Sequence, residues 1–136
     1  MDRRIAKEFL HIQNWLDRAA WIVEAGRDVY DADPLLREAG DSLVMKIGEA
    51  ANRLSKLGVK APESVSWADA IASRNWLIHQ YDLIDRDITW ATLERDLPVL
   101  RAALAESFEL AAETVTARTQ SDIADGQGTP AAPERW

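Results

Sequence analysis

Apolar side chains recur every three or four residues along most of the chain, and no segment alternates apolar and polar residues for the length of a strand. This spacing places the apolar residues on one face of an α-helix. The first apolar stripe is formed by Ile5, Phe9, Ile12, Leu16, Ala19 and Val23. Gly26 is a suitable end for this helix. The chain is therefore predicted to be all-α.

Capping signals delimit two further helices. Asp33 followed by Pro34 predicts the N-cap and first turn of a second long helix that ends before Gly58. A third helix is predicted to start at Ser66, where Ser66-Trp67-Ala68-Asp69 is similar to a capping box, and to run through Tyr81.

The last helix is predicted to start at Asp85 or Asp87 and to reach about Arg118. Pro98 lies inside it and predicts a kink or a break. Residues 119–136 contain mostly small and polar residues, which is typical of a disordered tail. We therefore expect residues 1–118 to form one antiparallel bundle of four, or at most five, helices.

Composition narrows the class of protein. The chain has 136 residues, a net charge of −7, no cysteine and two histidines. It lacks a continuous apolar run for a membrane span or a secretory signal, and together with the absence of cysteine this favours a cytoplasmic protein. Two histidines do not suffice for a histidine-rich metal site. The acidic charge means that binding of RNA requires a local basic feature or a partner.

The first two helices carry more large apolar side chains than one narrow stripe needs. Trp15, Trp21 and Ile22 lie beside the main apolar face of the first helix. An excess of this kind favours an interface between two copies of the chain, and helix packing within one chain is the alternative.

The stretch ASRNWLIHQYDLID, residues 72–85, combines an apolar run with four polar side chains, Arg74, Asn75, His79 and Tyr81. On a helix, Arg74 and Tyr81 share one face, whereas His79 lies about 140° around from Arg74. The three side chains therefore cannot meet within one straight helix. Either the helix ends irregularly after His79, or a second copy across a two-fold axis supplies the missing partner.

These residue types suffice for cleavage of RNA without a metal ion or a cofactor. An imidazole such as that of His79 can take a proton from a ribose 2′-hydroxyl. The guanidinium of Arg74 can hold the phosphate and offset its developing charge, while Asn75 can orient His79. The structural alternative is a buried arginine hydrogen-bonded to helix ends, beside a histidine that stacks on Trp76 or Tyr81.

The octamer Arg74-Asn75-Trp76-Leu77-Ile78-His79-Gln80-Tyr81 fits the pattern R-x-x-x-x-H-x-Y and the looser R-N-x-x-x-H signature of HEPN domains. Its flanks resemble the HepT-like branch, in VMKIGEAANRLSK and in VSWADAIASRNWLIHQYDLIDRDITWATLERDLPVL. The resemblance extends over roughly Ile5 to Ala112.

The resemblance implies a HEPN bundle that acts as the toxin of a type VII-like toxin–antitoxin pair. HepT-like toxins are homodimeric ribonucleases whose motifs face each other at the two-fold, and a minimal nucleotidyltransferase, MntA, is the antitoxin. The family's arginine and histidine fall on Arg74 and His79, its frequent polar residue falls on Asn75, and the tyrosine that receives AMP falls on Tyr81. The rival interpretation is a non-catalytic HEPN module that pairs with a nucleotidyltransferase. The acidic charge favours this rival, and the intact arginine, histidine and tyrosine favour the toxin.

Overall fold

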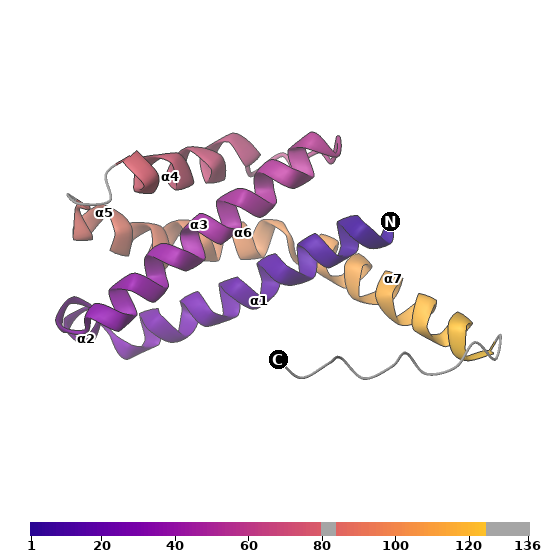
Figure 1. Ribbon diagram of the computed structural model, residues 1–136, viewed down its shortest axis with the longest axis horizontal. Coiled ribbons are helices and arrows are strands. Elements are labelled where there is room, and N and C mark those ends of the chain that lie inside the picture. The colour runs from indigo at the N-terminus through magenta and orange to yellow at the C-terminus, as the bar shows by residue number, and fades with distance from the viewer. Residues whose placement is uncertain (80–83, 125–136) are drawn as a thin grey trace.

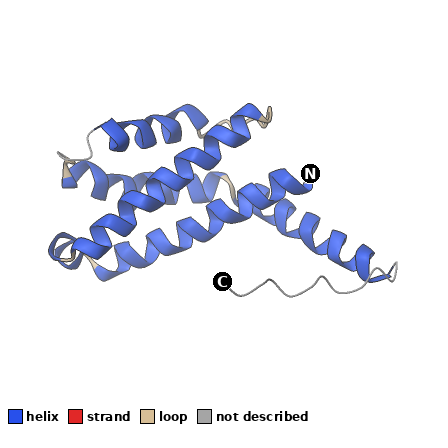
Figure 2. Ribbon diagram, viewed as in Figure 1, coloured by secondary structure: helices blue, strands red, loops and turns tan. Residues whose placement is uncertain are grey.

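The chain folds into a helical bundle, which a computed structural model describes for residues 1–79 and 84–124. No strand occurs in these residues, so the predicted all-α fold is confirmed (Figure 2). The elements in chain order are α1 (Arg3–Ala25), α2 (Arg27–Ala32), α3 (Pro34–Lys56), α4 (Trp67–His79), α5 (Arg86–Ala91), the π-helical turn η2 (Thr92–Asp96), α6 (Leu97–Ala103) and α7 (Ala105–Ala124).

The bundle is antiparallel, with α3 at its centre (Figure 1). The helix α3 packs against α1 on one side and against α4 on the other, and α7 packs against α1. The segment from α5 to α6 passes behind α3 in the view of Figure 1. No helix in the described part of the chain combines the length and the apolar character needed to cross a membrane.

The helix ends follow the capping signals of the sequence. Gly26 ends α1 with a φ of +92°, a backbone conformation that favours glycine. The side chain of Asp33 accepts a hydrogen bond from the backbone N–H of Leu35 at 2.9 Å, and Pro34 occupies the first turn of α3. The short helix α2 between these two caps was not predicted.

The last predicted helix is interrupted twice, and the kink or break expected near Pro98 is confirmed. The backbone N–H of Leu97 donates to the carbonyl of Thr92, five residues back, which makes η2 a π-helical turn. Pro98 has no N–H to donate to the carbonyl four residues before it, which explains the irregular turn at this place. A second break at Leu104 precedes α7. The helix α7 continues to Ala124, past the expected boundary at residue 118, and the rest of the predicted tail, residues 125–136, lies outside the described residues.

The tryptophans divide between core and surface. Trp67 and Trp90 are buried, and the indole N–H of Trp67 donates to the carbonyl of Val59 at 2.9 Å. Trp15 and Trp76 are half-buried against the core. Trp21 is 71% exposed. Packing within the chain therefore accounts for most of the tryptophans, but not for Trp21.

Candidate functional site

The motif helix α4 packs closely against α3 at Gly48. A Cβ added at Gly48 would lie 2.5 Å from the Cβ of Arg74 and 2.8 Å from the carbonyl oxygen of Ala70. Both distances are shorter than real Cβ contacts, so no larger residue fits here without a shift of α4. Gly48 thus sets the position of Arg74 relative to α3. The sequence interpretation gave Gly48 no role, although a glycine in the interior of a long helix is itself a signal of close packing.

Arg74 is half-buried and hydrogen-bonded to its neighbour Asn75. The Nε and Nη2 atoms of Arg74 donate to the Oδ1 of Asn75 at 3.2 and 2.9 Å. Among the described residues, no carboxylate lies within ion-pair distance of Arg74. An amide oxygen orients the guanidinium without cancelling its charge, so Arg74 keeps a full positive charge for an anionic ligand. The structure shows that the Asn75 oxygen orients Arg74. The side chain of His79, which Asn75 was expected to orient, lies outside the described part of the structure.

His79 is the last residue of α4 that the structure describes, five residues after Arg74. At about 100° per residue its Cα lies about 140° around the helix from that of Arg74, as the spacing predicted. Tyr81, the predicted acceptor of AMP, lies outside the described residues. The structure thus brings together Arg74 and Asn75 from the predicted site, and it places the backbone of His79 at the end of the same helix.

The chain that follows the motif is anchored by a buried ion pair. The Nη1 and Nη2 atoms of Arg86 donate to the two carboxylate oxygens of Asp41 at 3.0 Å each, and Nη1 also donates to the hydroxyl of Tyr30 at 3.0 Å. Asp41 is 7% exposed and Tyr30 is fully buried. The pair links α5 to α3 three residues after the undescribed segment 80–83, and thereby fixes one end of the segment that carries Tyr81.

Two pKa shifts reflect this burial. Burial raises the pKa of the Tyr30 hydroxyl, and the hydrogen bond from Arg86 opposes this only in part. Burial also opposes the charge of Arg86, but the hydrogen bonds to Asp41 and Tyr30 outweigh it and raise the pKa of Arg86. Tyr30 is thus neutral and Arg86 charged at neutral pH. The sequence interpretation did not include Tyr30, Asp41 and Arg86. The available signal was an acid on a buried face of α3, because Asp41 lies seven residues before Gly48 and therefore on the same face of the helix.

Acidic residues that follow the motif in the sequence interact with other groups of the chain. Asp85 caps α5 by accepting from the backbone N–H of Asp87 at 2.8 Å, in agreement with the predicted start of the last helix at Asp85 or Asp87. The carboxylate of Asp87 is paired with Arg27. Asp82 lies outside the described residues. The negative charge of Asp87 is therefore offset in part by Arg27.

One hollow lies beside α4 and another lies along α3. A cavity of about 340 Å³ between α4 and α5 is lined by Trp76, Leu77 and Ile88, and it is mainly apolar. A groove of about 520 Å³ runs along α3 to the start of α5 and contains Arg37, Lys46 and Arg86 beside acidic residues. Ile78 and Ile88, which are 47% and 49% exposed, add apolar surface near the end of α4.

Comparison with known proteins identifies the family. The model of the family "Ribonuclease HepT-like" matches residues 12–107. A protein of Caldanaerobacter subterraneus subsp. tengcongensis named "Putative RNase" is 25% identical over 103 residues, which cover 73% of this chain and 92% of the relative. A protein of Methanocaldococcus jannaschii with the same name is 27% identical over 105 residues, 74% of this chain and 94% of the relative. No solved structure matches the chain at a significant level. The match of the family model over most of the chain confirms the resemblance drawn from the motif, and the protein belongs to the HepT-like ribonuclease family.

Proposed function

We propose that this protein is the toxin of a type VII-like toxin–antitoxin pair, an endoribonuclease that cleaves RNA without a metal ion. The observation that carries the proposal is the state of Arg74. Its guanidinium is oriented by Asn75, has no carboxylate partner among the described residues, and lies on the helix whose last described residue is His79. An arginine with these properties is ready to bind a phosphate.

In the proposed cleavage reaction, His79 and Arg74 have different roles. The 2′-oxygen of the ribose attacks the adjacent phosphorus while the imidazole of His79 takes the 2′-hydroxyl proton. Arg74 donates hydrogen bonds to the non-bridging oxygens and stabilises the charge of the phosphorane. The bond from phosphorus to the 5′-oxygen then breaks, and that oxygen takes a proton from water. The products are a 2′,3′-cyclic phosphate and a 5′-hydroxyl.

The active unit in this proposal is a homodimer whose two-fold axis passes near His79 of both chains. The angular offset between Arg74 and His79 supports this, because a second copy can supply the group that one straight helix cannot. The exposed side chains of Ile78 and Ile88 provide apolar surface at the same end of α4. A monomer in light scattering at micromolar concentration would contradict the dimer.

The proposed control is transfer of AMP to the hydroxyl of Tyr81 by an MntA-like nucleotidyltransferase. Tyr81 follows Arg74 by seven residues, an interval that places two side chains on one face wherever the backbone is α-helical. An AMP group on Tyr81 would then occupy the phosphate site, pair with Arg74 and exclude RNA.

The second candidate is a non-catalytic module that pairs with a nucleotidyltransferase, and the net charge of −7 favours it. Cleavage of total RNA in EDTA by the wild type and by the His79→Ala and Arg74→Ala variants separates the two, with circular dichroism as the control for folding. The toxin predicts a loss of about 10²–10⁴ in rate for His79→Ala. If the His79→Ala protein cleaves as fast as the wild type, or if EDTA stops the wild type, the mechanism is wrong.

A further inference from the structure

Cations and aromatic rings line one exposed face of α1. The residues of this stripe, which we call the α1 track, follow one another at intervals of three or four: Arg4, Lys7, His11, Trp15, Arg18 and Trp21. All are exposed except Trp15, which is half-buried. The imidazole of His11 stacks on the indole of Trp15, with ring centroids 5.7 Å apart and an angle of 19° between the planes. A face of this composition is unusual in a chain with a net charge of −7.

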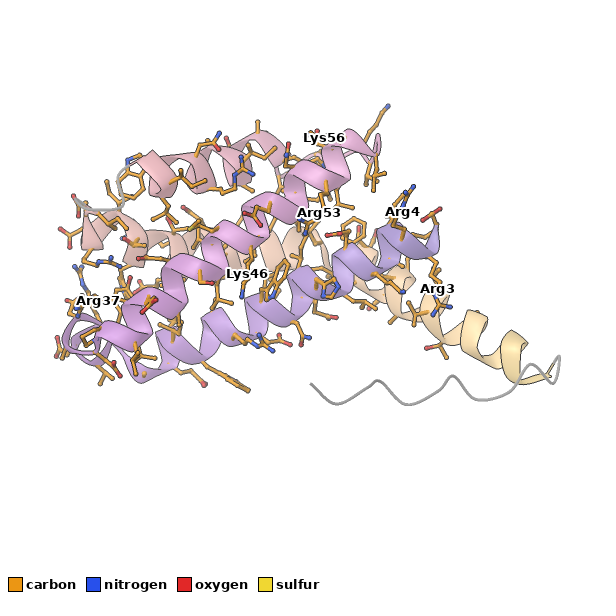
Figure 3. The ribbon with its side chains drawn as sticks, in the orientation of Figure 1. Arg3, Arg4, Arg37, Lys46, Arg53 and Lys56 are labelled. Atoms are coloured by element: carbon orange, nitrogen blue, oxygen red, sulfur yellow. The ribbon has the colours of Figure 1, made fainter. Side chains whose placement is uncertain are left out.

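The end of the α1 track is hollowed. Trp21 and Arg18 of α1 and Lys46 of α3 share a cavity of about 330 Å³ with apolar residues of both helices. The indole of Trp21 is 71% exposed, so it offers a free aromatic surface with a cation on each of the two helices. Figure 3 shows Lys46 and Arg53 along α3 and Arg4 near the start of α1.

The two cations that line this hollow, Arg18 and Lys46, are available to an anionic ligand. Neither Arg18 nor Lys46 makes an ion pair with any residue that the structure describes. Glu8, an acid of α1 close to the track, is held by Arg53 through two hydrogen bonds of 2.9 and 3.0 Å. Asp17 is held by Arg101 at 2.7 Å. Glu8 and Asp17 of α1 are therefore paired with cations outside the track, whereas Arg18 and Lys46 have no such partner among the described residues.

We infer that the α1 track binds single-stranded RNA, with unpaired bases stacked on Trp21 and on the His11–Trp15 pair and with phosphates bound by Arg18 and Lys46. This inference rests on the proposed ribonuclease function and adds the place where the substrate lies outside the cleavage site. Aromatic side chains bind any base through its π-face, and cations beside them bind the backbone. From Arg4 to Trp21 the track is about 25 Å long at 1.5 Å per residue, enough for several nucleotides.

Charge complementarity favours RNA over a second copy of the chain as the occupant. In a symmetric dimer built on this face, the cations of one copy would approach those of the other, which is unfavourable. A duplex is also a poor fit, because its bases are stacked on one another and cannot cover an indole.

The test measures binding rather than cleavage. Fluorescence anisotropy of a labelled 12-nucleotide uridine-rich strand, and of the same strand in a duplex, is recorded in the His79→Ala background so that the probe stays intact. Trp21→Ala is expected to raise the Kd for the single strand at least fivefold, because it removes one ring on which a base stacks. Lys46→Glu is expected to raise the Kd and to reduce the slope of log K against log salt by about one.

Two matched variants serve as controls. Val99→Ala removes another exposed apolar side chain, on α6, and Arg95→Glu reverses another exposed cation, on η2. Both are expected to leave the Kd within about twofold of the wild type. Equal effects of Trp21→Ala and Val99→Ala, or equal affinity for single strand and duplex, would overturn the inference. A change of sedimentation mass in Trp21→Ala with an unchanged Kd would assign the face to self-association instead.

The outcomes for the two proposals are distinguishable. If Arg74 and His79 prove essential for cleavage but Trp21→Ala binds RNA as the control does, the α1 track fails and the ribonuclease stands. If the strand binds through Trp21 but cleavage does not depend on His79, the mechanism fails and the track stands. If the protein binds no single strand, the track is wrong.

Discussion

The guanidinium of Arg86 at the start of α5 donates to both carboxylate oxygens of Asp41 on α3, each at 3.0 Å. Asp41 is 45 residues away in sequence, so this pair joins two elements that the chain itself does not hold together. It is also one of the fixed points around the motif: Gly48 sets the position of α4 before it, and Arg86 sets the start of α5 after it.

Asp41→Ala is expected to lower the free energy of unfolding by about 2–3 kcal/mol. Removal of one partner from a buried pair typically costs about 3–5 kcal/mol, and the loss is smaller here because the side chain of Arg86 is 29% exposed. Urea unfolding followed by circular dichroism measures the change. The control is Asp17→Ala, which breaks the exposed pair with Arg101 and should cost about 1 kcal/mol or less. Similar losses in the two variants would show that Asp41 and Arg86 do not act as a buried pair.

Tyr30 is expected to titrate above the ordinary tyrosine pKa of about 10, because burial raises its pKa. The chain has two tyrosines, so in the Tyr81→Phe variant the phenolate absorbance comes from Tyr30 alone. A folded-state pKa above the unfolded value means that Tyr30 contributes stability below about pH 10, which is lost as the pH rises through the folded pKa. The decline of unfolding free energy above pH 10 should therefore be weaker in Tyr30→Phe. A phenolate midpoint at or below pH 10 in the folded protein would contradict this.

Gly48→Ala is expected to lower the rate of RNA cleavage while the protein still folds. The added Cβ would meet Arg74 and the carbonyl of Ala70 at distances that real Cβ atoms do not adopt, so α4 must move away from α3. A displacement of about 1 Å at a phosphate-binding group can cost about 10²-fold in rate. The rate in EDTA and the melting temperature are measured together, and Glu49→Ala, at the exposed neighbouring position, is the control. An unchanged rate in a folded Gly48→Ala protein would remove Gly48 from the site.

The sequence allowed prediction of the features that depend on local spacing. The helices α1, α3 and α4 were expected because apolar periodicity and caps such as Asp33 act over a few residues. The break in the last helix was expected because Pro98 cannot donate a backbone hydrogen bond. The helix α2 was missed because six residues are too short to show a period.

The parts that depend on distant contacts could not be predicted. The pairing of Asp41 with Arg86 and the close approach at Gly48 each require two helices to meet in space. The spacing of residues along the sequence does not specify which helices meet. The hydrogen bonds between Arg74 and Asn75 were not predicted for a related reason. The four-residue interval pointed only to His79, whereas the long side chain of Arg74 turns back to the adjacent amide. The motif identified Arg74, but its charge environment became visible only in the structure.

Asn75→Asp is expected to impair cleavage more strongly than Asn75→Ala. In both variants Arg74 loses the amide oxygen that now orients it at 2.9 and 3.2 Å. Aspartate also places a carboxylate at that position, which pairs with the guanidinium, offsets its charge and repels a phosphate. Alanine leaves the charge of Arg74 in place but allows its side chain more rotamers, so we expect the cleavage rate to fall about tenfold in Asn75→Ala. We expect a fall of about a hundredfold or more in Asn75→Asp, which is the effect of removing one preorganised donor.

Because exposed charges are screened by salt, the aspartate variant should recover part of its substrate affinity relative to the wild type as the salt concentration rises, and the alanine variant should not. Initial rates on a short RNA at two salt concentrations measure both effects, with circular dichroism as the control for folding. Equal rates for the two variants would mean that the charge of Arg74 does not bind the substrate.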